Sequence, residues 1–222
     1  MRIVSRGLRM IRIFAVSGFK NSGKTTLCRK LLSELARLGV RTGYIKRTSD
    51  EVLDDDDTDT SAVERMGVAS ALWGTDGLCF EEAETKPFTP EYIVSRYFPD
   101  AEIVILEGGK YLDLPKIWVE SGEPRPAGVR GVFMVYDRGA AGDGKLRFGE
   151  GDEAIIAGRL AATVRGSYYR SSKVYIGDRP LPMKDFIADF VRGAVLGMLA
   201  SLKGGKDPQA PVRIYLDGEA KK

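Results

Sequence analysis

The residues best suited to chemistry lie near the start of the chain, where residues 18–25 read Gly-Phe-Lys-Asn-Ser-Gly-Lys-Thr. This is a full match to the phosphate-binding loop pattern G-x-x-x-x-G-K-[ST]. Gly18 and Gly23 let the backbone turn so that its N–H groups face anionic oxygens. Lys24 supplies a mobile positive charge for the outer phosphates of a nucleotide, and the Thr25 hydroxyl is suited to bind Mg²⁺. The pattern therefore predicts a site for a polyphosphate.

Two neighbouring elements favour this interpretation over the alternative, a glycine-rich turn with an incidental lysine. Residues 11–16 are a short apolar run rich in β-branched side chains, which predicts a buried strand ending at the loop. After the loop, leucines recur at helical spacing over residues 25–38, and Gly39 supplies a stop signal. Strand, glycine-rich loop and helix are the required setting, because the positive end of the helix dipole then faces the phosphates.

Lys24 is the candidate catalytic residue of this loop, because phosphoryl chemistry depends mainly on positioning and electrostatic stabilisation. Lys20 also lies in the loop, where it could lean across the phosphates. The residues expected to bind the nucleotide are Gly18, Lys20, Asn21, Ser22, Gly23, Lys24, Thr25 and Thr26.

A phosphate loop also needs an acid on a neighbouring strand to hold the Mg²⁺ ion. Glu107 is the first candidate, since it ends an apolar strand predicted at residues 102–106, where open α/β sheets bind ligands. Gly108 and Gly109 follow it and would let a ligand approach. The alternative is a strand-end carboxylate with no metal role.

Asp59 is a second candidate metal ligand. It belongs to a strongly acidic segment, residues 50–60, which predicts a flexible loop leaving a strand at residues 43–46. An acid in that loop could reach the metal through a water molecule. The alternative is that the whole acidic segment is solvated surface charge.

Three cations are expected at the same edge of the sheet. Lys46 and Arg47 close the strand at residues 43–46, and Lys110 follows Glu107 closely. These side chains could neutralise a second anionic group or contact a partner. The alternative is that each of them is an ordinary surface cation.

Composition limits the classes of protein that this chain can belong to. With 222 residues, 43% of them hydrophobic, the chain suits one sizeable domain with a small appendage. A formal net charge of +3 is mild and predicts neither a nucleic-acid nor a membrane partner. The chain has no histidine, which excludes histidine zinc sites and Ser-His-Asp triads.

The expected location is the cytoplasm. No apolar run reaches the roughly 18 residues needed to span a bilayer, and residues 1–10 lack the apolar stretch of a secretory signal. Cys28 and Cys79 stand apart, without a C-x-x-C pair, which favours reduced thiols.

The remaining elements predict an α/β fold. Because a strand–helix–strand crossover implies parallel pairing, we expect a P-loop NTPase-like, mostly parallel sheet flanked by helices over residues 1–167. Further strands are expected at residues 70–73, 78–81, 117–119 and 132–136, further helices at residues 61–66, 90–98 and 152–164, and an exposed loop at residues 137–151.

Residues 168–222 are expected to form a small β-α-β extension. Strands are predicted at residues 173–176 and 212–216, on either side of a long helix at residues 183–202. The helix is apolar over a broad face, so we expect it to pack on the main domain or on a partner chain.

A combination of motifs between residues 11 and 136 resembles MobB-type molybdopterin-guanine dinucleotide biosynthesis proteins. The motifs are the phosphate loop extended to Thr-Thr-Leu, Ile-Lys ending at Lys46, Asp-Thr at Asp59, Leu-Glu-Gly-Gly-Lys around Glu107 and Leu-Pro-Lys-Ile-Trp-Val around Lys116. The phosphate loop is shared with many NTPases, whereas the combination is specific.

The resemblance implies a GTP-binding accessory protein of molybdenum cofactor biosynthesis, with Mg²⁺ and at most weak GTP hydrolysis. It implies that residues 18–26 hold the phosphates and that Asp59 and Glu107 are the family's acids. Lys116 looks like the lysine of the family's Pro-Lys-Ile segment, and we expect it to contact a second anion or a partner. The expected partners are molybdopterin or its guanylyltransferase enzyme, and the expected assembly is a homodimer.

Two other functions stay open at this point. One is a small-molecule kinase or ATP-dependent ligase of related P-loop fold. The other is a non-catalytic, nucleotide-responsive scaffold whose tail helix binds a partner. No Asn-Lys-x-Asp motif is present to read guanine, so the sequence leaves the preference between GTP and ATP open.

Overall fold

A computed structural model gives the fold of most of the chain. It describes residues 12–50, 52, 66, 68–82, 87–164, 172–177, 179–181, 183–205 and 212–216. The candidate ligand Asp59 and residues 61–65 of the helix predicted at residues 61–66 lie outside these residues, so both stay predictions.

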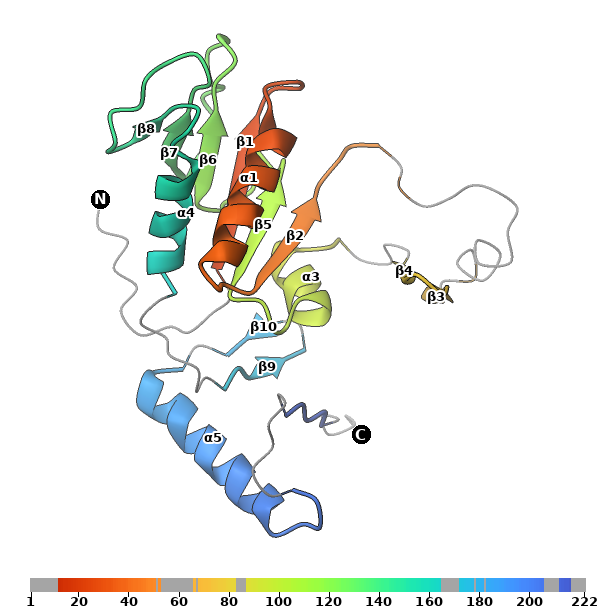
Figure 1. The fold of residues 1–222 in the computed structure, drawn as a ribbon. Helices are drawn as coiled ribbons and strands as arrows, with labels where there is room; N and C mark the ends of the chain where they lie inside the picture. The colour runs from red at the N-terminus through yellow and green to blue at the C-terminus, as the bar shows by residue number, and fades with distance from the viewer. Residues whose placement is uncertain are drawn as a thin grey trace. The chain divides into compact units, whose positions relative to one another are not determined.

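A six-stranded parallel sheet forms the centre of the fold, with strand order β2-β5-β1-β6-β7-β8 (Figure 1). Parallel pairing brings the carboxyl ends of all these strands to one edge, as predicted. The strands are β1 (Arg12–Gly18), β2 (Thr42–Lys46), β5 (Ile103–Glu107), β6 (Lys116–Val119), β7 (Val132–Tyr136) and β8 (Arg147–Phe148).

Helices cover both faces of this sheet. On one face, α1 (Lys24–Arg37) and α4 (Glu153–Ala162) pack side by side over a core that includes Phe14, Ile105 and Leu31. The other face carries α3 (Pro90–Tyr97), whose Val94 packs with Val104 of β5. The predicted start of α3 is confirmed, because the Thr89 hydroxyl accepts a hydrogen bond from the Tyr92 backbone N–H at 3.1 Å.

A small antiparallel hairpin forms a second sheet, from β3 (Ser70–Trp73) and β4 (Leu78–Glu81). Both strands are as predicted, and in the turn between them the Gly74 N–H donates to the Gly77 carbonyl at 2.9 Å. Trp73 and Leu78 are exposed in this hairpin.

One expected loop contains an additional strand. Residues 147–148 fall within the exposed loop expected at residues 137–151, but they form β8 and pair with the end of β7. Phe148 is fully buried in the main core. A strand of two residues is too short to show a periodic pattern in the sequence. It can be recognised only from its pairing with the neighbouring strand.

The tail contains a short hairpin and a long helix. The hairpin strands are β9 (Tyr175–Ile176) and β10 (Arg179–Pro180), and the helix is α5 (Asp185–Ala200). The predicted strand at residues 212–216 is wrong, since this segment has no regular structure. Its alternating apolar pattern is strand-like, but among the described residues no strand pairs with its backbone.

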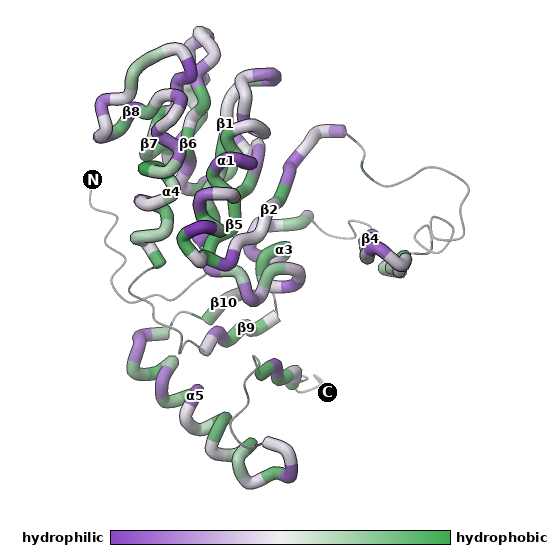
Figure 2. The backbone as a smooth tube through the Cα atoms, viewed as in Figure 1, coloured by the Kyte–Doolittle hydropathy of each residue, from purple (hydrophilic) through white to green (hydrophobic). Residues whose placement is uncertain are grey.

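The chain divides into two compact units. One contains residues 11–166 and 175–180, and the other contains residues 1–10, 167–174 and 181–222. In the second unit, α5 carries exposed apolar side chains, among them Phe186 and Phe190, which are 70% and 74% exposed. Figure 2 shows that hydrophobic residues recur along this helix. The division of the sequence at residue 167 stays a prediction.

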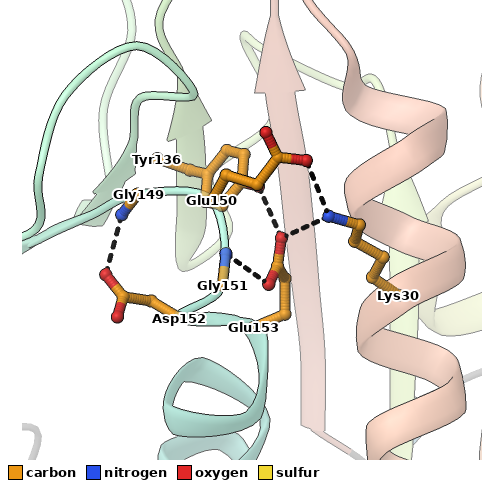
Figure 3. A network of polar contacts seen from close by, with 7 residues as sticks. All are labelled: Lys30, Tyr136, Gly149, Glu150, Gly151, Asp152 and Glu153. Atoms are coloured by element: carbon orange, nitrogen blue, oxygen red, sulfur yellow. Dashed lines mark hydrogen bonds and ion pairs between the residues drawn. The ribbon is translucent and has the colours of Figure 1, made fainter.

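A buried polar network joins the two helices on one face of the sheet. Glu153, at the start of α4, accepts hydrogen bonds from Lys30 of α1 at 2.8 Å and from the Tyr136 hydroxyl at 2.6 Å (Figure 3). Lys30 also contacts Glu150 at 3.2 Å. Burial alone would raise the pKa of Glu153, but the bonds from Lys30 and Tyr136 outweigh it and lower the pKa from 4.5 to about 2.

This network predicts a pH-dependent contribution to stability. Because the folded-state pKa of Glu153 is lowered, the stabilisation is complete above pH 4.5 and is lost as the pH falls toward 2. Glu153→Gln should lower the free energy of unfolding by about 2 kcal/mol near neutral pH and flatten its decline in that acid range. Urea unfolding at several pH values measures both effects.

The matched control is Glu150→Gln, which removes the exposed partner of the same lysine. It should change stability by less than about 0.5 kcal/mol, because exposed ion pairs contribute little. Equal losses in the two variants would contradict the role given to Glu153.

Candidate functional site

The predicted phosphate loop connects β1 to α1 at the carboxyl edge of the sheet. Gly18 ends β1, and a Cβ built there would lie 2.7 Å from the Val119 carbonyl oxygen, so only glycine fits. Gly23 precedes α1 with φ 92°, and Asn21 has φ 61°. Among the described residues, no side chain caps the start of α1, and its first turn has no acid, so its N–H groups and positive dipole end suit an external anion.

Lys24 lies across this loop. Its Nζ donates to the carbonyl of Phe19 inside the loop. Burial lowers the pKa of Lys24, and the positive charges of Lys110 and Lys46 lower it further, whereas Glu107 opposes the change. The ammonium therefore lies within electrostatic reach of both the candidate acid and the candidate cations.

Glu107 and Thr25, predicted to share a metal ion, lie together. The Thr25 hydroxyl donates to Glu107 Oε1 at 2.7 Å, although the two residues come from α1 and β5. The register of the parallel strands brings them together, because Glu107 of β5 pairs with Val16 near the end of β1, just before the loop that leads to Thr25. Glu107 is only 5% exposed, so its carboxylate lies at the base of the loop and not on the outer surface.

Tyr44 is a site residue that the sequence did not reveal. Its hydroxyl donates to the second oxygen of Glu107, Oε2, at 2.6 Å. Burial and this hydrogen bond raise the pKa of Tyr44, so the phenol keeps its proton and fixes the carboxylate. A tyrosine inside a short strand is typical of core packing, and only the β2–β5 pairing places it beside an acid.

The two glycines after Glu107 turn the chain sharply away from the site. Gly108 has φ 96°, and a Cβ there would lie 2.7 Å from the Arg47 carbonyl oxygen. The Gly108 carbonyl accepts a 2.6 Å hydrogen bond from the Ser17 hydroxyl. The glycines thus allow close passage of the chain beside β2, and the Ser17 bond fixes the turn next to the loop.

The three predicted cations and Lys20 lie on loops or strand ends at this edge. Lys46 and Arg47 are exposed at the end of β2, and Lys20 is exposed in the phosphate loop. Lys110 Nζ lies 5.1 Å from the centre of the Phe19 ring, over the loop itself. Lys110 and Lys46 are the two whose charges reach Lys24.

Lys116 is placed differently from the predicted anion or partner contact. It is fully buried, and its Nζ donates to the backbone carbonyls of Leu112 at 2.6 Å, Leu114 at 3.1 Å and Arg130 at 2.6 Å. Burial lowers its pKa, and the nearby Asp113 carboxylate opposes this. An ammonium has three protons, so Lys116 holds the surrounding loops together and has none left for an external anion.

The residues present fit a Mg²⁺ ion. Magnesium prefers oxygen ligands and is usually held by one or two carboxylates together with substrate phosphates. The Thr25 hydroxyl oxygen and the Glu107 carboxylate oxygen would be the two oxygen ligands that the protein supplies. The Ser22 hydroxyl, buried inside the loop, has no hydrogen-bond partner among the described residues. The described residues contain no cluster of three or more metal-binding side chains, so this metal would depend on nucleotide oxygens.

Comparison with known proteins identifies the family. Residues 13–128, just over half of the chain, match the family model for MobB, molybdopterin guanine dinucleotide synthesis protein B. The chain belongs to the MobB family. The matched residues include the phosphate loop, Tyr44, Glu107 and Lys116, and end before β7.

Curated MobB relatives agree with this assignment. The Escherichia coli molybdopterin-guanine dinucleotide biosynthesis adapter protein is 27% identical over 137 residues, which cover 60% of this chain and 77% of that protein. The Haemophilus influenzae protein of the same name is 28% identical over 116 residues, which cover 51% of this chain and 65% of that protein.

Solved MobB structures show the same fold. The MobB homolog from Bacillus stearothermophilus matches with a TM-score of 0.51 and 22% identity, over 69% of this chain and 98% of that chain. MobB from Bacillus subtilis matches with a TM-score of 0.52 and 20% identity, over 68% of this chain and 96% of that chain.

In the part of the chain that the structure describes, no helix is long and apolar enough to cross a bilayer.

Proposed function

We propose that this MobB-family chain binds GTP with Mg²⁺ at residues 18–26, and that it serves molybdenum cofactor biosynthesis as an accessory protein. The observation that carries the proposal is the 2.7 Å contact between the Thr25 hydroxyl and the Glu107 carboxylate, at the base of a phosphate loop. Two hard oxygen ligands from separate elements meet where the outer phosphates would lie.

The chain's own residues divide the work of holding the nucleotide. The loop N–H groups and the start of α1 bind the phosphate oxygens. Lys24 gives up its hydrogen bond to the Phe19 carbonyl and binds the phosphate oxygens in its place. Tyr44 keeps the Glu107 carboxylate oriented toward Thr25. A bound Mg²⁺ would neutralise charge on the phosphates. Without a histidine or an evident water-positioning glutamine, hydrolysis would be weak, and an arginine from a partner could raise it.

Family membership supports a wider role in molybdenum cofactor biosynthesis. The two curated relatives are named as adapter proteins of molybdopterin-guanine dinucleotide biosynthesis. We therefore propose that this chain acts as a cytoplasmic homodimer together with molybdopterin or its guanylyltransferase enzyme. A competition titration of GTP, ATP and molybdopterin against the purified chain, with Mg²⁺ present, tests the proposal. Binding of none of the three would contradict it, and preference for ATP would contradict the choice of GTP.

The metal role of Glu107 gives a sharper test. Glu107→Gln keeps the shape of the side chain but removes its negative charge, so it should weaken Mg²⁺-dependent GTP binding by about tenfold. In the wild-type chain, adding a chelator should cause a similar loss, and in the variant the chelator should have little further effect. Isothermal titration calorimetry with and without chelator measures both.

Glu102→Gln is the matched control, because Glu102 lies just before β5, at the opposite end of the same strand. It should leave GTP affinity unchanged in Mg²⁺. Wild-type affinity that is the same with and without chelator would count against the metal role.

A further inference from the structure

Arg138 lies beside the phosphate loop, although neither the motifs nor the family match includes it. It lies two residues after β7, at the carboxyl edge of the sheet, beyond matched residues 13–128. Its side chain lies against the phosphate loop, because a Cβ built on Gly23 would be 3.1 Å from Arg138 Nη1 and 3.3 Å from its Cδ. The guanidinium therefore borders the glycine that immediately precedes α1 and Lys24.

The charges around this guanidinium favour an anion. The positive dipole end of α1 lies beside it, because Gly23 directly precedes the helix, and the first turn of α1 has no acid. Among the described residues, Arg138 has no ion-pair or hydrogen-bond partner, although Asp137 is adjacent in sequence. A guanidinium without an ion-pair partner, placed at the positive end of a helix, is electrostatically unfavourable, and a negatively charged ligand relieves this.

The loop that carries Arg138 is tied to the sheet on both sides. The Asp137 N–H donates to the Phe148 carbonyl at 2.8 Å, and the Asp137 carboxylate accepts from the Gly139 N–H at 3.0 Å. Asp143 Oδ1 accepts three further backbone N–H groups, at 2.7 to 2.9 Å. These bonds set the course of the backbone on both sides of Arg138.

The strand order shows which end of a nucleotide Arg138 would meet. Glu107 ends β5, on one side of β1, whereas β6 and β7 lie on the other side (Figure 1). The Thr25–Glu107 pair marks the metal side, where the β- and γ-phosphates would lie. A nucleotide held in the loop then extends its α-phosphate and nucleoside in the opposite direction, toward the end of β7.

We propose that Arg138 binds the nucleoside end of the nucleotide, with its guanidinium on the α-phosphate. This inference rests on the proposed function, since it requires nucleotide binding at residues 18–26. A planar guanidinium suits this position because it binds phosphate oxygens in a bidentate manner and remains charged at any physiological pH. Arg138 thus belongs to the same chain as the phosphate loop, unlike an arginine supplied by a partner. It binds the end of the nucleotide that lies opposite to the metal.

Comparing two nucleotides tests this assignment. GTP and GDP share the α-phosphate and nucleoside and differ only in the γ-phosphate. Arg138→Ala should weaken the binding of both by the same factor, about tenfold, by calorimetry. Arg138→Lys, which keeps the charge but lacks the planar fork, should recover only part of the loss. The melting temperature of either variant without nucleotide should match that of the wild-type chain.

Arg29→Ala is the matched control, because Arg29 is exposed on α1 and loses the same charge. It should leave both affinities unchanged. Loss of GTP binding alone in Arg138→Ala would place the guanidinium at the γ-phosphate and overturn the proposal, as would unchanged affinity for both nucleotides. A wild-type chain that binds neither nucleotide would overturn the proposed function and this inference together.

Discussion

Replacing Lys24 with alanine should reduce the affinity for GTP by at least about tenfold while leaving the fold intact. The ammonium is the one loop side chain whose charge is partly buried at the base of the site, where a phosphate contact is strong. Among the described residues, its one hydrogen bond is to the Phe19 carbonyl, so its removal leaves a single loop carbonyl for water to hydrogen-bond. Calorimetric titration and thermal unfolding together measure binding and stability.

Lys145→Ala controls for the loss of one positive charge, because Lys145 is exposed in the loop before β8. Its affinity for GTP should equal that of the wild-type chain. If Lys24→Ala binds GTP as tightly as the wild-type chain does, residues 18–26 are not the nucleotide site. A Lys24→Ala chain that unfolds at a much lower temperature would show instead that this lysine mainly supports the fold.

Replacing Lys116 with methionine should have the largest effect on stability, lowering the free energy of unfolding by about 3 kcal/mol. Methionine fills nearly the same volume, so packing is largely kept. The variant nevertheless removes the hydrogen bonds that Lys116 donates to the carbonyl oxygens of Leu112, Leu114 and Arg130. Among the described residues, only the Leu112 oxygen keeps a second donor, the Leu114 N–H. Buried acceptors left without a donor are costly. Urea denaturation gives the change.

The same variant separates a structural role from the predicted anion contact. At a temperature where Lys116→Met is still folded, its affinity for GTP should equal that of the wild-type chain. Lys145→Met, at an exposed position, should change stability by less than about 0.5 kcal/mol. A folded, stable Lys116→Met that has lost nucleotide or partner binding would restore the contact expected from the sequence.

The fold was largely predictable because its signals are local. The apolar runs of β1, β5 and β7 and the leucine spacing of α1 each identify their element within a few residues. The same is true of the phosphate loop, whose residues are consecutive. Glu107 could be identified because it ends the most apolar strand, and parallel pairing brings every such end to one edge.

The residues that sequence analysis missed or misplaced depend on distant neighbours. Tyr44 looks like a core tyrosine until β2 pairs with β5 and brings it to Glu107. Lys116 looks like a site cation, and only the approach of the Leu112–Leu114 and Arg130 segments reveals its buried bonds. Arg138 carries no motif, and its contact with Gly23 arises from the packing of the loop after β7 on the phosphate loop.

The order in which these strands lie in the sheet also has a consequence during synthesis. Tyr44 leaves the ribosome long before Glu107, and the β5 strand that carries Glu107 must insert between β1 and β2, its neighbours on both sides. Contacts between residues so far apart in sequence form slowly, so the nascent chain holds an unfinished pocket until β5 is in place. A nucleotide that binds only the completed pocket would then stabilise the folded chain by mass action and would favour the final insertion over misfolding.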